Sequence, residues 1–224
     1  FKEQPFQNAQ KLTIISAHYY VPQDYKKYSE NFVKTPVFLK KHYLEHINTK
    51  KINIIFDLGY NQGTNEIAIN KLMPNYKEIH AFEPIYNLCR DNLIENFAKD
   101  NRTKIIPNAV SDEIGQFDFY VSPSGAHIDS QLFFKKRENY QKYIVNTTTI
   151  DSYCKENNVY PDYIKMDIEG AEFPALKGGL ESIKKSRPQL AISIYHSERD
   201  FVKIPIYLYE NLENYVFKLG HYSL

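Results

Sequence analysis

The chain has 224 residues, with 28 basic and 27 acidic side chains that give a formal net charge of +1. This length is sufficient for one domain with a sizeable core, and the balanced charge gives no indication of a nucleic-acid partner. No apolar run approaches the roughly 20 residues that a membrane-spanning helix needs, and no signal-peptide pattern opens the sequence. Cys89 and Cys154 lie far apart in predicted helices, where a buried thiol is the usual role, so we expect a cytoplasmic protein.

Residues 1–50 lack a regular alternation of strands and helices. Lys11–Tyr20 is compatible with a short strand or an irregular segment, and Tyr25–His46 has a helical pattern that is interrupted near Pro36. We therefore predict an N-terminal helical extension or lid over residues 1–50, followed by one domain over residues 51–224.

From Ile52 onwards, apolar strand-like runs alternate with helical patterns. This alternation is typical of an α/β fold with a doubly wound, mostly parallel sheet of the Rossmann-like kind. The predicted strands are Ile52–Asp57, Glu78–Phe82, Lys104–Val110, Tyr163–Met166, Leu190–Tyr195 and Tyr215–Leu219. The predicted helices are Thr64–Met73, Ile85–Phe97, one that begins near Asp151, one that begins near Glu169, and Phe201–Asn214.

The pattern changes between the third and fourth of these strands. Apolar and polar residues alternate in Phe117–Val121, which predicts an edge strand or an antiparallel strand. Ser122–Gln131 is rich in turn-forming residues and is either a plain surface loop or a mobile lid. Ile144–Ile150 is a second extended stretch, and Asp151 is the predicted N-cap of the helix that follows it.

Polar side chains stand at the ends of four predicted strands: Asp57, Glu83, Asp167 and His196. The carboxyl ends of parallel strands meet at one edge of a sheet, and this edge is where ligands bind. We therefore expect these four side chains to converge on one site.

The loop after the first strand, Asp57–Gly63, carries Gly59 and Gly63 in the spacing G-x-x-x-G. Dinucleotide-binding proteins have G-x-G-x-x-G instead, so the spacing favours S-adenosylmethionine over a nicotinamide cofactor. Asp57 is a suitable partner for the cationic amino group of the methionine part, and Asn61 can form hydrogen bonds at the same end. A nicotinamide-dependent oxidoreductase remains the alternative.

Glu83 follows the next strand along the chain. A carboxylate at this place can accept hydrogen bonds from both hydroxyls of a ribose. The alternative is that Glu83, which precedes Pro84, only stabilises the positive end of a helix dipole. The nearby glycine loop favours ribose binding.

Together with further motifs, these residues resemble the FkbM family of S-adenosylmethionine-dependent methyltransferases. The resemblance spans roughly Ile52–Leu219, and one departure is Tyr60, where the family usually has a small residue. The motifs are Asp57–Gly63, Phe82–Pro84, Asn108–Asp112, Lys165–Glu172 with Leu176 and Gly178, and Ser193–His196.

The resemblance implies a seven-stranded sheet of the class I methyltransferase type, with an antiparallel last strand. It also implies O-methylation of a small-molecule or glycan acceptor, often a sugar hydroxyl or a natural product, with S-adenosylmethionine as the methyl donor. Carried over to this sequence, the cofactor-binding positions are Asp57, Gly59, Asn61 and Gly63 for the methionine part, Glu83 for the ribose, and Asn108, Ala109 and Val110 for the adenine edge.

Methyl transfer to a hydroxyl needs a base that removes the hydroxyl proton. His196 is the first candidate, because a histidine titrates near neutral pH, although it can also serve only to bond a neighbour. Asp167 can orient His196, hold the cofactor amine or act as the base itself. Glu169 is separated from Asp167 by one residue and is expected to face the same cleft.

Asp167, Glu169 and His196 also form a possible oxygen-rich site for Mg²⁺, which we do not favour, so we predict no metal ligand. For Glu172, stabilisation by the helix dipole is a sufficient explanation. A third hypothesis for the whole chain is a non-catalytic binding module that has kept the methyltransferase fold.

Overall fold

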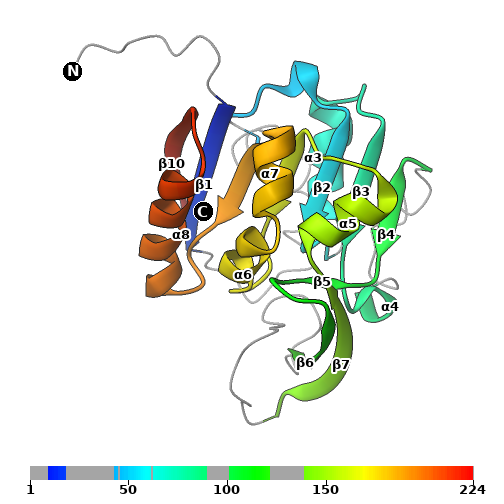
Figure 1. Cartoon of the computed structure of the whole chain (residues 1–224). Helices are drawn as coiled ribbons and strands as arrows, with labels where there is room; N and C mark the ends of the chain where they lie inside the picture. The colour runs from blue at the N-terminus through cyan, green and yellow to red at the C-terminus, as the bar shows by residue number, and fades with distance from the viewer. Residues whose placement is uncertain are drawn as a thin grey trace.

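The computed structural model describes residues 10–18, 43–44, 46–61, 63–89, 101–121 and 139–223. Within these ranges, seven strands form the main sheet in the order β10-β1-β9-β8-β2-β3-β4 (Figure 1). Every neighbouring pair of these strands is parallel. The strands are β1 (Gln10–His18), β2 (Ile54–Leu58), β3 (Glu78–Phe82), β4 (Thr103–Ile106), β8 (Tyr163–Met166), β9 (Gln189–Ser193) and β10 (Tyr215–Ser223).

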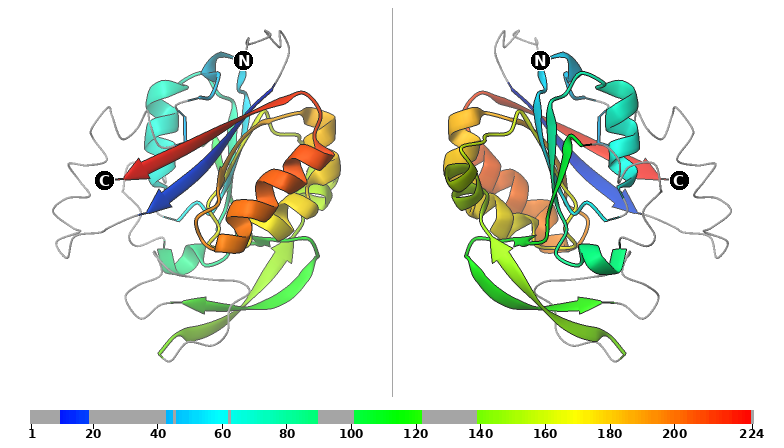
Figure 2. Two further views of the ribbon diagram at one scale, coloured as in Figure 1. Left: turned by 90° about the vertical axis from the view of Figure 1, so that its left-hand side faces the viewer. Right: turned by 90° about the vertical axis from the view of Figure 1, so that its right-hand side faces the viewer.

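Helices cover both faces of this sheet (Figure 2), as expected for a doubly wound α/β fold. One face carries α3 (Thr64–Leu72), and the other carries α5 (Ile150–Asn157), α6 (Glu172–Lys177), α7 (Leu180–Ser186) and α8 (Glu198–Asn211). Two short helices, η1 (Thr49–Lys51) and α4 (Tyr86–Cys89), lie in connections. No helix in the described ranges has both the length and the apolar character that crossing a membrane requires.

Alternating side chains of the strands fill two separate cores. Phe56 and Leu58 of β2 belong to the core under α5–α8, which also contains Cys154. Ile55 of the same strand belongs to the core under α3, together with Ile69. Because β2 is buried on both faces, it appears in the sequence as a continuous apolar run. The prediction that Cys154 is a buried helical residue is confirmed.

A second, smaller sheet follows β4. It contains β5 (Ala109–Val110), β7 (Gln141–Thr148) and β6 (Gly115–Val121) in that order. The predicted antiparallel strand is confirmed, because β6 pairs antiparallel with β7. The prediction of one strand as far as Val110 was wrong, since β4 ends at Ile106 and β5 pairs with β7. Pro107 separates them, and a proline has no N–H to continue a strand ladder.

The expected direction of the last strand of the main sheet was also wrong. The last strand, β10, runs parallel to its neighbour β1 instead of antiparallel. It follows the long helix α8, and a helical crossover returns the chain to the edge where the previous strand began, so the next strand is parallel. The first described segment is β1, which lies between β9 and β10 and agrees with the short strand considered for Lys11–Tyr20. The predicted helical lead-in stays a prediction, because most of it lies outside the described residues.

Most of the predicted helix Tyr25–His46 lies outside the described residues, as does the predicted loop Ser122–Gln131. The described positions that follow pack closely on the main sheet. Tyr43 and Leu44 are buried in the core under α3. The backbone of Asn48 exchanges two hydrogen bonds with the side chain of Gln189 in β9, with N–O distances of 2.7 and 3.1 Å. The last part of residues 1–50 is therefore attached to β9.

The N-cap of α5 differs from the prediction by two residues. The hydroxyl of Thr149 accepts a hydrogen bond from the N–H of Ser152 at 3.0 Å, which makes Thr149 the cap. The carboxylate of Asp151 instead accepts the N–H of Ser182 at 2.7 Å, near the start of α7. Asp151 was predicted from its residue type alone, whereas its partner lies 31 positions away in the chain.

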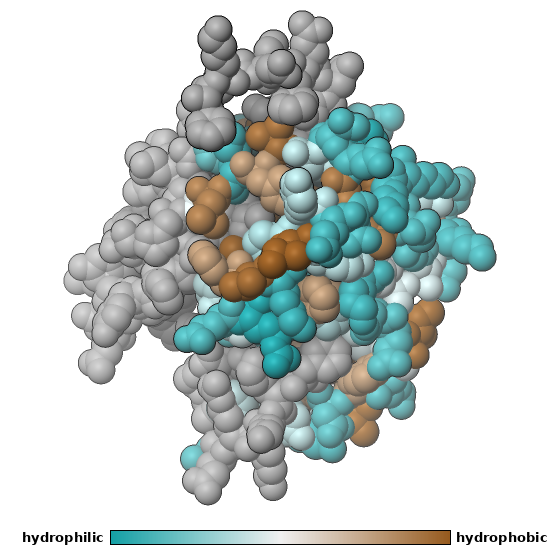
Figure 3. Space-filling model, turned by 60° about the vertical axis from the view of Figure 1, so that its left-hand side comes forward, coloured by the Kyte–Doolittle hydropathy of each residue, from teal (hydrophilic) through white to brown (hydrophobic). Residues whose placement is uncertain are grey.

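Apolar side chains also reach the surface, interspersed with hydrophilic ones across the face that carries α8 and β10 (Figure 3). Five of the seven large apolar side chains that are exposed within the described ranges belong to these two elements. They are Phe201, Val202, Ile206 and Tyr209 of α8 and Leu219 of β10.

Candidate active site

The site lies where the direction of strand order reverses. β2 and β8 are neighbours, but β3 and β4 lie beyond β2, whereas β9 lies beyond β8. In open α/β sheets, ligands bind beyond the carboxyl ends of the strands at such a point. Asp57 is near the end of β2, and Asp167 directly follows β8. The fold therefore brings the predicted cofactor loop and the predicted catalytic residues together.

The glycine loop crosses the end of β8 at close range. Gly59 has a φ of +83°, and a Cβ at this position would lie 1.9 Å from the carbonyl oxygen of Asp167. The N–H groups of Gly59 and Tyr60 both donate to the carbonyl of Phe82 at 3.1 Å. Only glycine fits a backbone that is left-handed and in contact with a neighbouring strand end.

Tyr60, the residue that differs from the usual family sequence, supports this loop from its buried side. Its ring is buried in the core under α3, and its hydroxyl donates to the carboxylate of Glu66 at 2.5 Å. Thr103 donates to the other oxygen of Glu66 at 2.8 Å. The ring of Tyr60 therefore packs against the protein interior instead of stacking on a ligand.

Lys165 binds the loop to β8. Its ammonium group donates to the carbonyl of Gly59 at 2.7 Å and lies 3.0 Å from Oδ1 of Asp57. Both side chains of this ion pair are almost completely buried. From its place at the strand end, Asp57 was predicted to face the cofactor, and in this structure its carboxylate faces Lys165.

Glu83 binds the backbone of the glycine loop at Asn61, a contact that the sequence did not predict. One oxygen of the Glu83 carboxylate accepts the N–H of Asn61 at 2.9 Å, and the other accepts the N–H of Ile85 at 3.3 Å. Each oxygen keeps a further lone pair, with which it can accept a ligand hydroxyl. Burial raises the pKa of Glu83, and the two N–H donors act in the opposite direction.

The three predicted adenine-edge residues do not lie together. Asn108 is half-buried just beyond β4, and the carbonyl of Ile106 accepts the N–H groups of both Asn108 and Glu83. Ala109 and Val110 are buried in the second sheet. Asn108 is therefore close to Glu83, whereas the next two side chains pack into cores.

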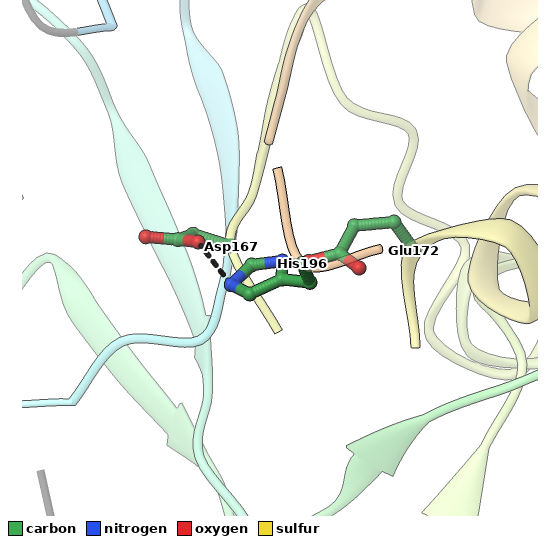
Figure 4. A group of neighbouring side chains, drawn as sticks. All are labelled: Asp167, Glu172 and His196. Carbon is green, nitrogen blue, oxygen red and sulfur yellow. Dashed lines mark ion pairs between the residues drawn. The ribbon is translucent and has the colours of Figure 1, made fainter. Parts of the chain in front are cut away.

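Four side chains form a compact group that we call the His196 cluster: Asp167, Glu169, Glu172 and His196. The ring of His196 lies between Asp167 and Glu172 (Figure 4). Its Nε2 is 3.5 Å from Asp167 and 3.2 Å from Glu169, and its Nδ1 is 3.1 Å from Glu172. Despite these short distances, neither ring nitrogen has a hydrogen bond of normal geometry.

Glu172 holds the turn between β8 and α6. Its carboxylate accepts the N–H of Ile168 at 2.8 Å and the N–H of Gly170 at 2.9 Å. These bonds stabilise a turn in which Glu169 and Gly170 both have positive φ angles, of 56° and 95°. A non-glycine residue in this region is strained, and such strain is common at functional sites.

Asp167 is held by two tyrosines. Its Oδ2 accepts the hydroxyl of Tyr43 at 2.7 Å, and its Oδ1 accepts the hydroxyl of Tyr195 at 3.0 Å. Burial acts to raise the pKa of Asp167, but Lys165, His196 and the two hydroxyls together lower it. Asp167 is therefore an ionised, fixed carboxylate.

The pKa values of His196 and Glu169 shift in the opposite direction. Burial acts to lower the pKa of His196, but Glu172, Glu169 and Asp167 together raise it to about 11. Burial raises the pKa of Glu169, although His196 opposes this effect. In this arrangement His196 is a cation at neutral pH. Glu169 is the carboxyl group of the cluster whose pKa is raised.

Asp167, Glu169 and His196 lie together, as the sequence predicted. The residues that hold them in place were not predicted. Tyr43 lies in Tyr25–His46, for which the sequence indicated only a helical pattern, and Tyr195 had no predicted role beyond the Ser193–His196 motif. Lys165 carried a usable signal, because a lysine inside a short apolar strand at a sheet centre needs a buried partner.

Comparison with known proteins gives consistent matches. Residues 57–221 match the family described as the methyltransferase FkbM domain. The chain is 26% identical over 185 residues to the 2-O-methyltransferase NoeI of Sinorhizobium fredii (strain NBRC 101917 / NGR234). The matched region covers 74% of this chain and 73% of that protein.

Among solved structures, methyltransferase FkbM from Methylobacillus flagellatus KT is similar, with a TM-score of 0.58 and 20% sequence identity. The match covers 83% of this chain and 44% of that one, so this chain spans less than half of that protein's length. At this identity the likeness supports the fold alone.

The ion pair under the glycine loop can be tested by a double-mutant cycle. We expect Lys165→Met to lower the free energy of unfolding by about 3–5 kcal/mol, because it leaves Asp57 buried and unpaired. The double variant Asp57→Asn/Lys165→Met should lose less than this single variant. Urea denaturation at neutral pH measures both, and Lys177→Met, which removes an exposed ion pair, should cost less than about 1 kcal/mol.

The charge on His196 predicts a pH dependence of stability. The pKa of His196 in the folded state, about 11, lies above the usual value of about 6.5, so the protonated ring stabilises the fold fully below about pH 6.5. This contribution is lost as the pH rises towards 11. The difference in unfolding free energy between wild type and His196→Gln should therefore shrink from pH 7 to 9.5, by at most about 1.4 kcal/mol per unit. A constant or growing difference, measured without divalent cations, would contradict this assignment.

Proposed function

Because the chain belongs to the FkbM methyltransferase family, we propose that it transfers a methyl group from S-adenosylmethionine to a hydroxyl oxygen of a sugar or glycan. The relative NoeI, named a 2-O-methyltransferase, supports oxygen as the acceptor atom. The geometry supports the same reaction class, because a cofactor-type loop and a group of titratable side chains meet at one sheet edge.

The observation that carries this proposal is the contact between Gly59 and Asp167. The backbone of the glycine loop passes so close to the end of β8 that a Cβ on Gly59 would overlap the carbonyl oxygen of Asp167. A ligand held by this loop is therefore next to the side chains that follow β8. Proximity of this kind is what a transfer between two bound molecules requires.

The described residues fit the proposed cofactor. S-adenosylmethionine supplies an activated methyl group on a sulfonium. Glu83 has free lone pairs for the ribose hydroxyls, and Asn108 lies beside it. The loop from Gly59 to Gly63, with Asn61, offers a close backbone approach for the methionine part.

We assign the proton transfer to Glu169. Its side chain is 27% exposed, whereas that of His196 is 6% exposed, so it is the more accessible of the two. Its pKa is raised by burial, which makes it a better proton acceptor at neutral pH than Asp167, whose pKa is lowered. His196 already holds a proton and stabilises the negative charges around it. Asp167, fixed by Tyr43 and Tyr195, positions the ring.

Cofactor binding is tested by calorimetry with S-adenosylmethionine. We expect Glu83→Gln to weaken binding by about 1.5–3 kcal/mol, because a charged hydrogen-bond acceptor is lost. Glu78→Gln, at the other end of β3 and facing solvent, is the matched control and should bind normally. Displacement of the ligand by a nicotinamide dinucleotide, or no binding at all, would refute the proposed cofactor.

Catalysis is tested with isotopically labelled S-adenosylmethionine and a panel of saccharides. We expect Glu169→Gln to lower the rate of methyl transfer by about 100-fold or more while cofactor affinity changes little. The control is Glu198→Gln, an exposed carboxylate at the start of α8. Equal rates for wild type and Glu169→Gln would remove Glu169 from the mechanism, and a wild type that binds cofactor without turnover would favour the non-catalytic binding module.

A further inference from the structure

The His196 cluster has more negative charge than its surroundings balance. Three carboxylates, those of Asp167, Glu169 and Glu172, lie within 3.5 Å of one imidazole ring. A protonated ring supplies one positive charge, and Lys165, which also acts on Asp167, is already paired with Asp57. Buried charges are normally paired or bound to a metal ion, because burial without compensation is costly.

The ring of His196 gives a second, independent observation. Its side chain is only 6% exposed, and neither nitrogen makes a hydrogen bond within the described part of the chain. Buried polar atoms of this kind almost always have a partner. Figure 4 shows the ring directed between Asp167 and Glu172, so both nitrogens point into the cluster.

From these contacts, we propose that the His196 cluster binds one divalent transition-metal cation through Asp167, Glu172 and His196. One donor atom from each of these residues lies within 4.8 Å of the other two. Ligands bound at about 2.1 Å on opposite sides of one ion are about 4.2 Å apart, so movements of a few tenths of an ångström close the site. The cation displaces the proton from the coordinating nitrogen of His196 to solvent and supplies two positive charges where that proton supplied one.

The donor atoms indicate which cation binds. Mg²⁺ and Ca²⁺ prefer oxygen ligands alone, whereas an imidazole nitrogen combined with carboxylates suits Mn²⁺, Fe²⁺ or Zn²⁺. This site differs from the Mg²⁺ site of Asp167, Glu169 and His196 that the sequence suggested, because Glu172 takes the place of Glu169 as a ligand. Asp167 is the partly exposed ligand, with 21% of its side chain accessible, and marks the side from which an ion enters.

This inference deepens the proposed function and rests on it for its role in catalysis. A cation held beside the glycine loop polarises a hydroxyl oxygen that coordinates it and makes its proton more acidic. Three protein ligands leave coordination positions for such oxygens. Glu169, adjacent to the cation but not a ligand, remains available to accept the proton.

The test uses Mn²⁺ as the probe on the full chain, without cofactor or acceptor. After removal of metals by a chelator, titration followed by electron paramagnetic resonance should show one Mn²⁺ bound per chain at micromolar concentration. Zn²⁺ should displace it, and equal concentrations of Mg²⁺ or Ca²⁺ should not. Asp167→Asn and His196→Gln should each weaken binding at least tenfold, whereas the matched controls Asp118→Asn and His46→Gln should not.

A second measurement on wild type covers the case in which a variant does not fold. Substoichiometric Mn²⁺ should broaden the amide signals of residues 167–172 and 195–197 first and leave those of residues 184–187, which precede the start of β9 at the opposite edge of the sheet, sharp. Binding only at millimolar concentration, or broadening that begins elsewhere, overturns the metal site. Calorimetry with S-adenosylmethionine in the presence of chelator is read separately: normal cofactor binding without Mn²⁺ binding rejects the metal site and leaves the proposed function standing.

Discussion

The arrangement of the site depends on a buried ion pair between two central strands. Lys165 of β8 reaches under the glycine loop, where it holds the carboxylate of Asp57 and the carbonyl of Gly59. The same ammonium group helps to keep Asp167 ionised. One lysine therefore fixes the shape of the proposed cofactor loop and the charge of the carboxylate beside it. An apolar side chain at position 165 could fill the space but could do neither.

The second constraint is electrostatic and comes from two segments of the chain, the turn from β8 into α6 and the end of β9. Asp167 follows β8, Glu172 begins α6, and His196 follows β9. Their proximity raises the pKa of His196, so the ring stays protonated at neutral pH. Glu169 is the carboxyl group of the cluster whose pKa is raised by burial. A histidine that titrates near pH 7 in isolation thus behaves differently when carboxylates surround it. The same surplus of negative charge underlies the proposed cation site.

Much of the fold was accessible from local patterns, because a strand buried on both faces produces a short apolar run. The strands β2, β3 and β8 were predicted within two residues of their observed bounds. The errors concern features that local patterns do not encode. Pro107 divides β4 from β5, and Asp151 caps a helix start other than its own. The position of β1 between β9 and β10 is a property of the whole sheet.

The sequence by itself determined the family, the order of strands and helices from Ile52 onwards, and the sheet edge where Asp57, Glu83, Asp167 and His196 converge. These follow from residue type and spacing, since parallel strands share one carboxyl edge. Only the tertiary structure decided what these side chains do there. It paired Asp57 with Lys165 and enclosed His196 in carboxylates. Charge and pKa depend on distances between atoms from different elements, and sequence spacing does not contain those distances.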